Sequence, residues 1–174
     1  DAELALGQKA FVARPDAPQM AEVYAAVQGF GSDVLTGKAD ILSLSGNVGI
    51  GKTHLLLRLY AYVDAAGRAV IYRTATRIQN ILQTFGYDEV SKADANRRRD
   101  IAIHDLTTVP LLLIDEADRA RSNTGYYENL LLDILNSRRA ARLATVFAGN
   151  DLAHDTRGLP APVLSRARSH GNRF

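Results

Sequence analysis

The chain has 174 residues, of which 47% are hydrophobic, and this size and composition fit one α/β domain with a single core. It contains no cysteine, which excludes disulfides and thiolate metal sites, and no apolar run reaches the ~18 residues that span a bilayer, so a cytoplasmic protein without a membrane partner is expected. The net charge is +2, but residues 138–174 hold seven arginines against two aspartates, an excess typical of a polyanion-binding surface, a subunit contact or a solvated surface.

Residues 1–38 are predicted to be a lead-in helix and linker that pack on the main folding unit, residues 39–174. Asp16 and Pro18 are typical of a helix start, and apolar side chains follow them at helical spacing. Three glycines are expected to mark the end of this helix: Gly29, Gly31 and Gly37.

Residues 46–53, GNVGIGKT, match the pattern Gly-x-x-x-x-Gly-Lys-[Ser/Thr] without a mismatch. The apolar residues before them predict a buried strand and residues 54–63 predict a helix, which is the context this phosphate-binding motif needs. Lys52 would reach the β- and γ-phosphates of a nucleotide, and Thr53 would offer its hydroxyl to Mg²⁺. The predicted nucleotide-binding residues are Gly46, Asn47, Val48, Gly49, Ile50, Gly51, Lys52, Thr53 and His54. The alternative is a chance glycine turn before a helix.

Residues 70–72 predict a second strand, after which Thr74 can cap a helix. Four apolar side chains share one face of that helix, which Gly86 should end: Ile78, Ile81, Leu82 and Phe85. Residues 87–106 are polar and predict a helix that carries three consecutive arginines, Arg97, Arg98 and Arg99. This arginine run indicates either a solvated helix face or a nucleic-acid contact.

Residues 111–114 are a continuous apolar run, typical of a strand buried on both faces, and Asp115-Glu116 follow it. Beside a phosphate-binding turn, Asp115 is predicted to hold Mg²⁺ and Glu116 to orient and deprotonate the attacking water. Residues 115–118 spell DEAD, yet the chain has neither the Ser-Ala-Thr tripeptide nor the length for the second RecA-like domain of DEAD-box helicases. We therefore reject that function.

Residues 130–136 predict a helix and residues 144–148 a strand that ends at Gly149-Asn150. Strands thus alternate with helices, which predicts a parallel, doubly wound α/β sheet with its ligand site at the carboxyl ends of the strands. A polar side chain at Asn150 would meet the γ-phosphate there. A simple turn asparagine is the alternative.

Five stretches carry a resemblance to a known family: GNVGIGKTHLL, AVIYRTATRIQNILQTF, LLLIDEAD, LLLDILNSRRAARLATVFAGND and PVLSRARSHGNRF. Through them residues 11–174 resemble the AAA+ domain of the DnaC/DnaI-type replicative helicase loaders, and IstB-type transposition helper ATPases share most of the pattern. The resemblance implies an AAA+ type P-loop NTPase core in residues 39–174. It also implies little or no C-terminal lid, because the chain ends before a recognisable sensor 2 arginine.

The resemblance implies ATP and Mg²⁺ as cofactors, with weak ATP hydrolysis that depends on assembly into a homo-oligomer. It implies single-stranded DNA and a replicative DNA helicase as partners. Asn150 matches the sensor 1 position. Arg166, with Arg168 as the fallback, matches an arginine finger that enters the neighbouring subunit's site, where a planar, permanently charged guanidinium can bind two phosphate oxygens.

The same resemblance places the neighbourhoods of Phe85 and Tyr127 inside the assembly, where unpaired bases could stack at ~1–3 kcal/mol each. The spacing of Phe85 also fits a core position. Phosphate contacts are expected from Arg97, Arg98, Arg99 and Arg121. Three other functions stay open: a transposition helper ATPase that binds duplex target DNA, a P-loop interaction module without hydrolysis, and an origin initiator.

Overall fold

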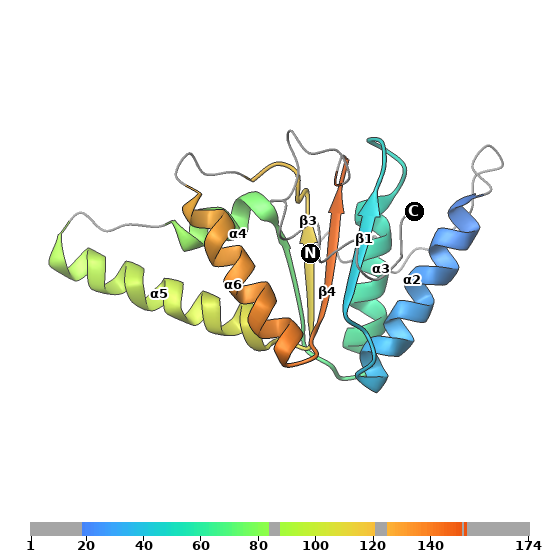
Figure 1. The fold of residues 1–174 in the computed structure, drawn as a ribbon, viewed down its shortest axis with the longest axis horizontal. Coiled ribbons are helices and arrows are strands. Elements are labelled where there is room, and N and C mark those ends of the chain that lie inside the picture. Colours follow the sequence, from blue (N-terminus) through green and yellow to red (C-terminus); the bar gives the residue numbers. More distant parts are fainter. Residues whose placement is uncertain (1–18, 84–87, 121–124, 151, 153–174) are drawn as a thin grey trace.

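The computed structural model describes residues 19–83, 88–120, 125–150 and 152 (Figure 1). Its sheet contains four strands in the order β1-β4-β3-β2: β1 (Ile41–Ser45), β2 (Val70–Thr74), β3 (Leu111–Asp115) and β4 (Ala144–Gly149). All three pairings are parallel, so the four carboxyl ends lie at the same edge of the sheet. The predicted parallel α/β sheet is confirmed.

Helices cover both faces of the sheet, and their bounds are α2 (Gln19–Thr36), α3 (Lys52–Ala65), α4 (Ala75–Leu82), α5 (Glu89–Thr108) and α6 (Tyr126–Ala140). The central strand β3 shows how the two faces divide. Leu111 and Leu113 pack in the core formed with α2 and α3, whereas Leu112 and Ile114 pack in the core formed with α4, α5 and α6. Alternating side chains of one buried strand thus fill two cores, which explains its continuous apolar sequence. In the described ranges no helix has the length and apolarity to cross a membrane.

Two helix starts follow from local sequence. The Thr74 hydroxyl accepts the backbone N–H of Arg77 at 3.3 Å and begins α4, as predicted. Asp88 begins α5 with a reciprocal pair of bonds, since its Oδ1 accepts the Ser91 N–H at 2.8 Å and Ser91 Oγ accepts the Asp88 N–H at 3.0 Å. The helix predicted in the polar segment is therefore present. Phe85 and Gly86 lie outside the described residues.

The expected end of α2 is confirmed at Gly37 but wrong at Gly29 and Gly31, because the helix continues through these two glycines and stops at Thr36. Gly31 is needed for packing: a Cβ added there would lie 2.9 Å from Cδ1 of Tyr62 and 3.0 Å from Cδ1 of Leu59. The glycine lets α2 approach α3 closely, a gain that offsets its low helix propensity. The division of the chain after residue 38 stays a prediction.

Arg138 is fully buried near the amino ends of the strands. Its Nε donates to Thr145 Oγ1 at 2.9 Å, and its Nη2 donates to the carbonyl of Ala144. Its Nη1 donates to the carbonyls of Leu106 and Val109, both at 2.8 Å. Burial lowers the pKa of Arg138 to about 10, so the guanidinium stays protonated at neutral pH. One side chain of α6 thereby links the end of α5 to the start of β4.

Candidate functional site

The glycine-rich turn leads from β1 directly into α3, which begins at Lys52. Gly49 (φ 83°) and Gly51 (φ 94°) adopt left-handed conformations that other residues rarely tolerate. The turn therefore brings the first N–H groups of a 14-residue helix to the carboxyl edge of the sheet, an arrangement that favours phosphate. The predicted order of strand, turn and helix is confirmed.

Lys52 extends its ammonium group back across this turn. Nζ donates to the carbonyl oxygens of Gly46 and Asn47, both at 2.8 Å, and to Oδ1 of Asn150 at 3.0 Å. Burial lowers the pKa of Lys52, and the carboxylates of Asp115 and Asp118 oppose this shift in part. The cation is thus held among neutral oxygen acceptors with carboxylates nearby, at the point where the motif predicts phosphate.

Asp115 ends β3 and lies 4% exposed beside the start of α3. Its Oδ2 accepts the hydroxyls of Thr53 at 2.7 Å and of Tyr72 at 3.0 Å, while its Oδ1 accepts the backbone N–H of Glu116 at 2.8 Å. The structure therefore brings together the two residues predicted to hold Mg²⁺. Sequence reasoning missed Tyr72. Alternation along β2 could have identified it, because Tyr72 shares the sheet face of Val70, which packs toward α3.

A carboxylate and a hydroxyl fit Mg²⁺, a cation that prefers oxygen ligands and keeps several of its waters. Across the described ranges no cluster of three or more His, Cys, Asp or Glu side chains is suited to a metal ion. Asp115 and Thr53 would therefore hold the ion together with phosphate oxygens and water, as in P-loop proteins. The ion would neutralise phosphate charge there.

Glu116 follows Asp115 with a left-handed backbone (φ 50°) that is uncommon for a residue other than glycine. Its Oε1 forms an ion pair with Nη1 of Arg119 at 3.2 Å, and 41% of its side chain is exposed. The carboxylate thus lies at the cavity but has a cationic partner that sequence reasoning did not anticipate. The predicted role of Glu116 in activating water stays a prediction.

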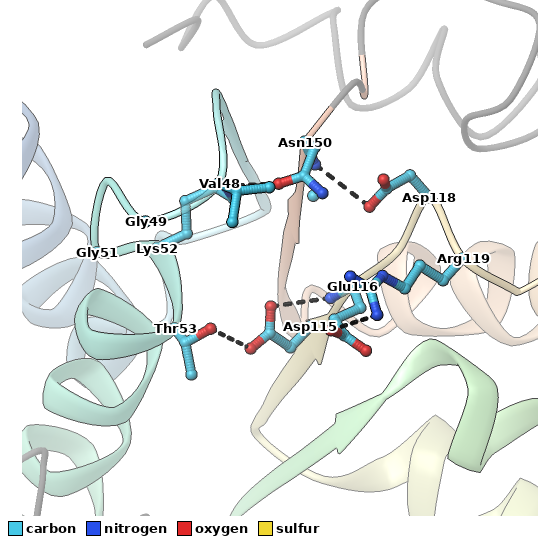
Figure 2. A pocket seen from close by; sticks show the side chains of 11 residues that line it. Val48, Gly49, Gly51, Lys52, Thr53, Asp115, Glu116, Asp118, Arg119 and Asn150 are labelled. Atoms are coloured by element: carbon cyan, nitrogen blue, oxygen red, sulfur yellow. Dashed lines mark hydrogen bonds and ion pairs between the residues drawn. The ribbon is translucent and has the colours of Figure 1, made fainter.

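A cavity of about 290 Å³ joins these groups at the carboxyl edge of the sheet (Figure 2). Its lining consists of Val48, Gly49, Gly51, Lys52, Thr53, Asp115, Glu116, Asp118, Arg119, Gly149 and Asn150. Eight of these were predicted for nucleotide, metal or catalysis, while Asp118, Arg119 and Gly149 were not. Four predicted residues of the turn are not part of this lining: Gly46, Asn47, Ile50 and His54. Gly46 and Asn47 still contribute through the carbonyl oxygens that hold Lys52.

The prediction that Tyr127 stacks on a base is wrong, because its side chain is only 2% exposed and packs in the core with Leu131 and Ile134. Burial also raises the pKa of Tyr127. The preceding residue, Tyr126, is 41% exposed. Both lie in the first turn of α6, where neighbouring residues point in different directions. One of the two side chains therefore faces the core and the other faces the surface.

Acidic side chains of α5 offset the charge of its arginine run. The helix carries four acidic side chains (Glu89, Asp94, Asp100 and Asp105) and four basic ones (Lys92, Arg97, Arg98 and Arg99). Arg97 and Arg98 are exposed, and Arg98 pairs with Asp94 at 3.3 Å. This balance favours the solvated-face interpretation. The other residues predicted for DNA or for the neighbouring subunit, Phe85, Arg121, Arg166 and Arg168, lie outside the described residues.

No protein-family model and no curated protein matches this chain. Several solved structures do. Domain III of the replication initiation protein DnaA from Thermotoga maritima has a TM-score of 0.70 and 20% identity, over 91% of this chain and 66% of that one. The replication initiator DnaA bound to AMPPCP and single-stranded DNA has a TM-score of 0.66 and 21% identity, over 83% of this chain and 43% of that one. A structure of DnaI has a TM-score of 0.64 and 17% identity, over 96% of this chain and 85% of that one.

These comparisons establish the fold. The chain has the parallel α/β fold seen in DnaA domain III and in DnaI, which agrees with the fold that the resemblance implied. It spans 47% of a DNA replication initiation factor that also matches, so it corresponds to part of that protein. At about 20% identity the likeness concerns the fold alone, and the chemistry must be argued from the site.

Proposed function

We propose that this chain is an ATP-binding and ATP-hydrolysing AAA+ module of the helicase-loader type that acts in DNA replication. The observation that carries the proposal is the convergence of Lys52, Thr53, Asp115 and Asn150 on one cavity, from the starts and ends of three different elements (Figure 2). A phosphate-binding turn, a magnesium ligand pair and a polar side chain facing the lysine are the parts that nucleoside triphosphate hydrolysis requires.

Each side chain has a distinct task in this proposal. Lys52 exchanges its backbone carbonyl acceptors for phosphate oxygens, while Asn150 holds its ammonium group in line. Thr53 and Asp115 hold Mg²⁺, and Tyr72 keeps the Asp115 carboxylate oriented. Glu116 takes the proton of the attacking water once its bond to Arg119 opens. Exposed ion pairs contribute only ~0–1 kcal/mol, so this opening costs little.

A titration with fluorescently labelled ATP in the presence of Mg²⁺ tests the site. Lys52→Ala removes charge-assisted hydrogen bonds of about 1.5–3 kcal/mol, so affinity should fall roughly 10- to 100-fold. Lys92→Ala is the matched control, because Lys92 is an exposed lysine of α5 that pairs with Glu89. Equal affinity of the Lys52→Ala protein and the wild type would remove the proposed site.

Assembly is part of the proposal. Arg166 would act on the nucleotide of a neighbouring copy, an effect that an arginine finger supplies at ~10³-fold or more. Arg166→Ala should therefore bind ATP normally and lose only the turnover that depends on protein concentration. Mixed with Glu116→Gln protein, it should regain activity, since some subunit pairs then combine an intact Glu116 with an intact Arg166. No recovery at any mixing ratio would contradict a shared site.

DNA and a replicative helicase are the proposed partners. One solved DnaA structure of this fold is described as bound to single-stranded DNA, and DnaI also shares the fold. A preference for single strands over duplex in the ATP state would support this proposal. A preference for duplex would favour the transposition helper instead.

A module with negligible hydrolysis is the second candidate, and it would apply if the Glu116–Arg119 ion pair stays closed when a nucleotide binds. In this case nucleotide binding alone would switch the surface that partners contact. Measured turnover, with and without single-stranded DNA, separates the two candidates. Turnover that stays at the background of the Glu116→Gln protein would select the second one.

A further inference from the structure

Asp118 connects the acidic turn after β3 to the end of β4. Its Oδ1 accepts the backbone N–H of Asn150 at 3.2 Å. One residue earlier, the N–H of Ala117 donates to the carbonyl of Ala148 at 2.8 Å. Two hydrogen bonds thus join these segments where both border the cavity, and Figure 2 shows the Asp118 carboxylate directed at Asn150.

Gly149 makes this contact possible. A Cβ at position 149 would lie 2.7 Å from Oδ1 of Asp118 and 2.6 Å from Cδ2 of Leu152, closer than real Cβ atoms approach other atoms. The backbone angles of Gly149 do not demand glycine, so its role here is to provide space. The carboxylate of Asp118 lies against the Cα of Gly149, which carries no side chain, and accepts the N–H of the next residue, Asn150.

The contact continues to the lysine of the glycine-rich turn. Asn150 is fixed through its N–H by Asp118 and presents Oδ1 to Lys52 Nζ at 3.0 Å. A shift of the Asn150 backbone would therefore move the acceptor that aligns the ammonium group.

We propose that Asp118 is the positioning residue for Asn150 and that, through Asn150 and Lys52, it sets how strongly the site prefers ATP to ADP. This inference rests on the proposed nucleotide site. Lys52 serves the β- and γ-phosphates, so its alignment affects ATP more than ADP. The required feature is the hydrogen bond, because the geometry depends on one oxygen placed against Gly149.

Two substitutions separate the hydrogen bond from the charge. Asp118→Asn keeps an oxygen acceptor at the same distance along the side chain and removes the charge. Asp118→Glu keeps the charge but adds a methylene, which displaces the carboxylate from the space above Gly149. Asp64→Asn, at the exposed far end of α3, controls for the loss of one negative charge.

The first measurement is hydrogen exchange at the Asn150 amide in the nucleotide-free protein. Exchange should stay slow in Asp118→Asn and become faster, about tenfold, in Asp118→Glu. The second measurement is the ratio of the ADP and ATP dissociation constants. It should stay within twofold of the wild type in Asp118→Asn and Asp64→Asn, and fall roughly tenfold in Asp118→Glu, which corresponds to about 1.4 kcal/mol.

The reverse pattern, with Asp118→Glu like the wild type and Asp118→Asn impaired, would show that charge matters and would overturn the inference. Two wild-type-like variants would overturn it as well. The experiment also distinguishes this inference from the proposed function. If the wild type binds neither nucleotide, the proposed function fails, whereas the exchange measurement still decides whether Asp118 positions Asn150.

Discussion

Nζ of Lys52 donates to Oδ1 of Asn150 across 3.0 Å, although 98 positions separate these residues along the chain. The bond crosses from the start of α3 to the segment after β4, the strand that lies beside β1 in the sheet. Together with the bond from Thr53 to Asp115, it joins the phosphate-binding turn to the rest of the cavity, and several expected outcomes depend on these contacts.

The affinity for ATP should depend on pH through Lys52. Burial lowers the pKa of Lys52 below its ordinary 10.5, and the protonated form is the one that binds phosphate. A bound phosphate in turn raises this pKa, so affinity is highest below the pKa of the free protein and falls as pH rises through it. The decline should begin below pH 10.5. Titrations across this range should show the decline in the wild type and a flat profile in Lys52→Ala.

Tyr72→Phe should weaken the binding of Mg²⁺ at the nucleotide site. The substitution removes one of the two hydroxyl donors at Oδ2 of Asp115 and keeps the ring. A hydrogen bond to a charged group contributes about 1.5–3 kcal/mol, and without this one the Asp115 carboxylate is held less firmly for Mg²⁺. The Mg²⁺ concentration for half-maximal ATP binding should therefore rise roughly tenfold or more. Tyr60→Phe on α3 is the control. An unchanged Mg²⁺ requirement in Tyr72→Phe would show that Tyr72 is not needed to orient Asp115.

Short sequence patterns were sufficient to predict the strands, the turn and the helix that surround this site. Residues 46–53 place a turn between a strand and a helix, and the apolar run that ends at Asp115 marks a strand buried on both faces. Thr74 was predicted as a cap for the same reason, because a hydroxyl before a helix bonds the N–H three residues on. Such features depend on neighbours in sequence, which a single chain displays.

Features that depend on distant neighbours could not be predicted. Gly31 was interpreted as a helix end, yet it provides space for Tyr62 on another helix. Tyr127 was predicted to stack on a base without knowledge of which face of α6 meets the sheet. Asp118 was given no role from the sequence, since its contact with Asn150 depends on the space that Gly149 leaves on a neighbouring strand. Each case needs the register of two elements that sequence spacing alone does not give.

Arg138→Lys should lower the free energy of unfolding by about 3 kcal/mol. A lysine cannot reach all four acceptors, and each buried acceptor left without a donor costs about 1–3 kcal/mol. The next residue is a matched control: Arg139→Lys should change stability by less than ~1 kcal/mol, because Arg139 is half exposed and its ion pair with Asp40 is 3.8 Å long. Urea denaturation gives both values.

Thr145→Val tests the same network from the acceptor side. It leaves Nε of Arg138 without its partner and should cost about 1–3 kcal/mol. In the double variant Arg138→Lys/Thr145→Val the two costs should sum to more than the measured loss, because both remove the same bond. Additive losses would mean that Arg138 and Thr145 stabilise the fold independently.

Glu116→Gln should bind ATP with near wild-type affinity and hydrolyse it slowly, because an amide keeps the shape but cannot accept a proton. Arg119→Gln should have the opposite effect on turnover. It removes the ion pair at Oε1 of Glu116, an exposed interaction of ~0–1 kcal/mol, so turnover should rise by up to roughly fivefold. A steady-state phosphate-release assay measures both. If Glu116→Gln turned over as fast as the wild type, another group would have to activate the water.

Contact with single-stranded DNA should involve Tyr126 and not Tyr127. The Tyr126 ring is 41% exposed at the start of α6, close in sequence to the cavity-lining turn after β3, whereas Tyr127 is buried. One stacked base contributes ~1–3 kcal/mol, so Tyr126→Ala should weaken oligonucleotide binding in the ATP state roughly tenfold and leave ATP affinity unchanged. Fluorescence anisotropy at two salt concentrations measures this, and the phosphate contribution should fall as salt rises.

Variants of Tyr127 serve as controls for the Tyr126→Ala experiment. Tyr127→Ala should destabilise the fold by about 3–5 kcal/mol, as expected for the loss of a buried aromatic ring, whereas Tyr127→Phe keeps the ring and should bind DNA like the wild type. If Tyr127→Phe bound DNA more weakly while Tyr126→Ala bound it normally, Tyr127 and not Tyr126 would be the DNA contact. A wild-type protein that prefers duplex would instead remove the single-strand assignment and favour the transposition helper, since stacking on an exposed ring needs bases that are not already paired.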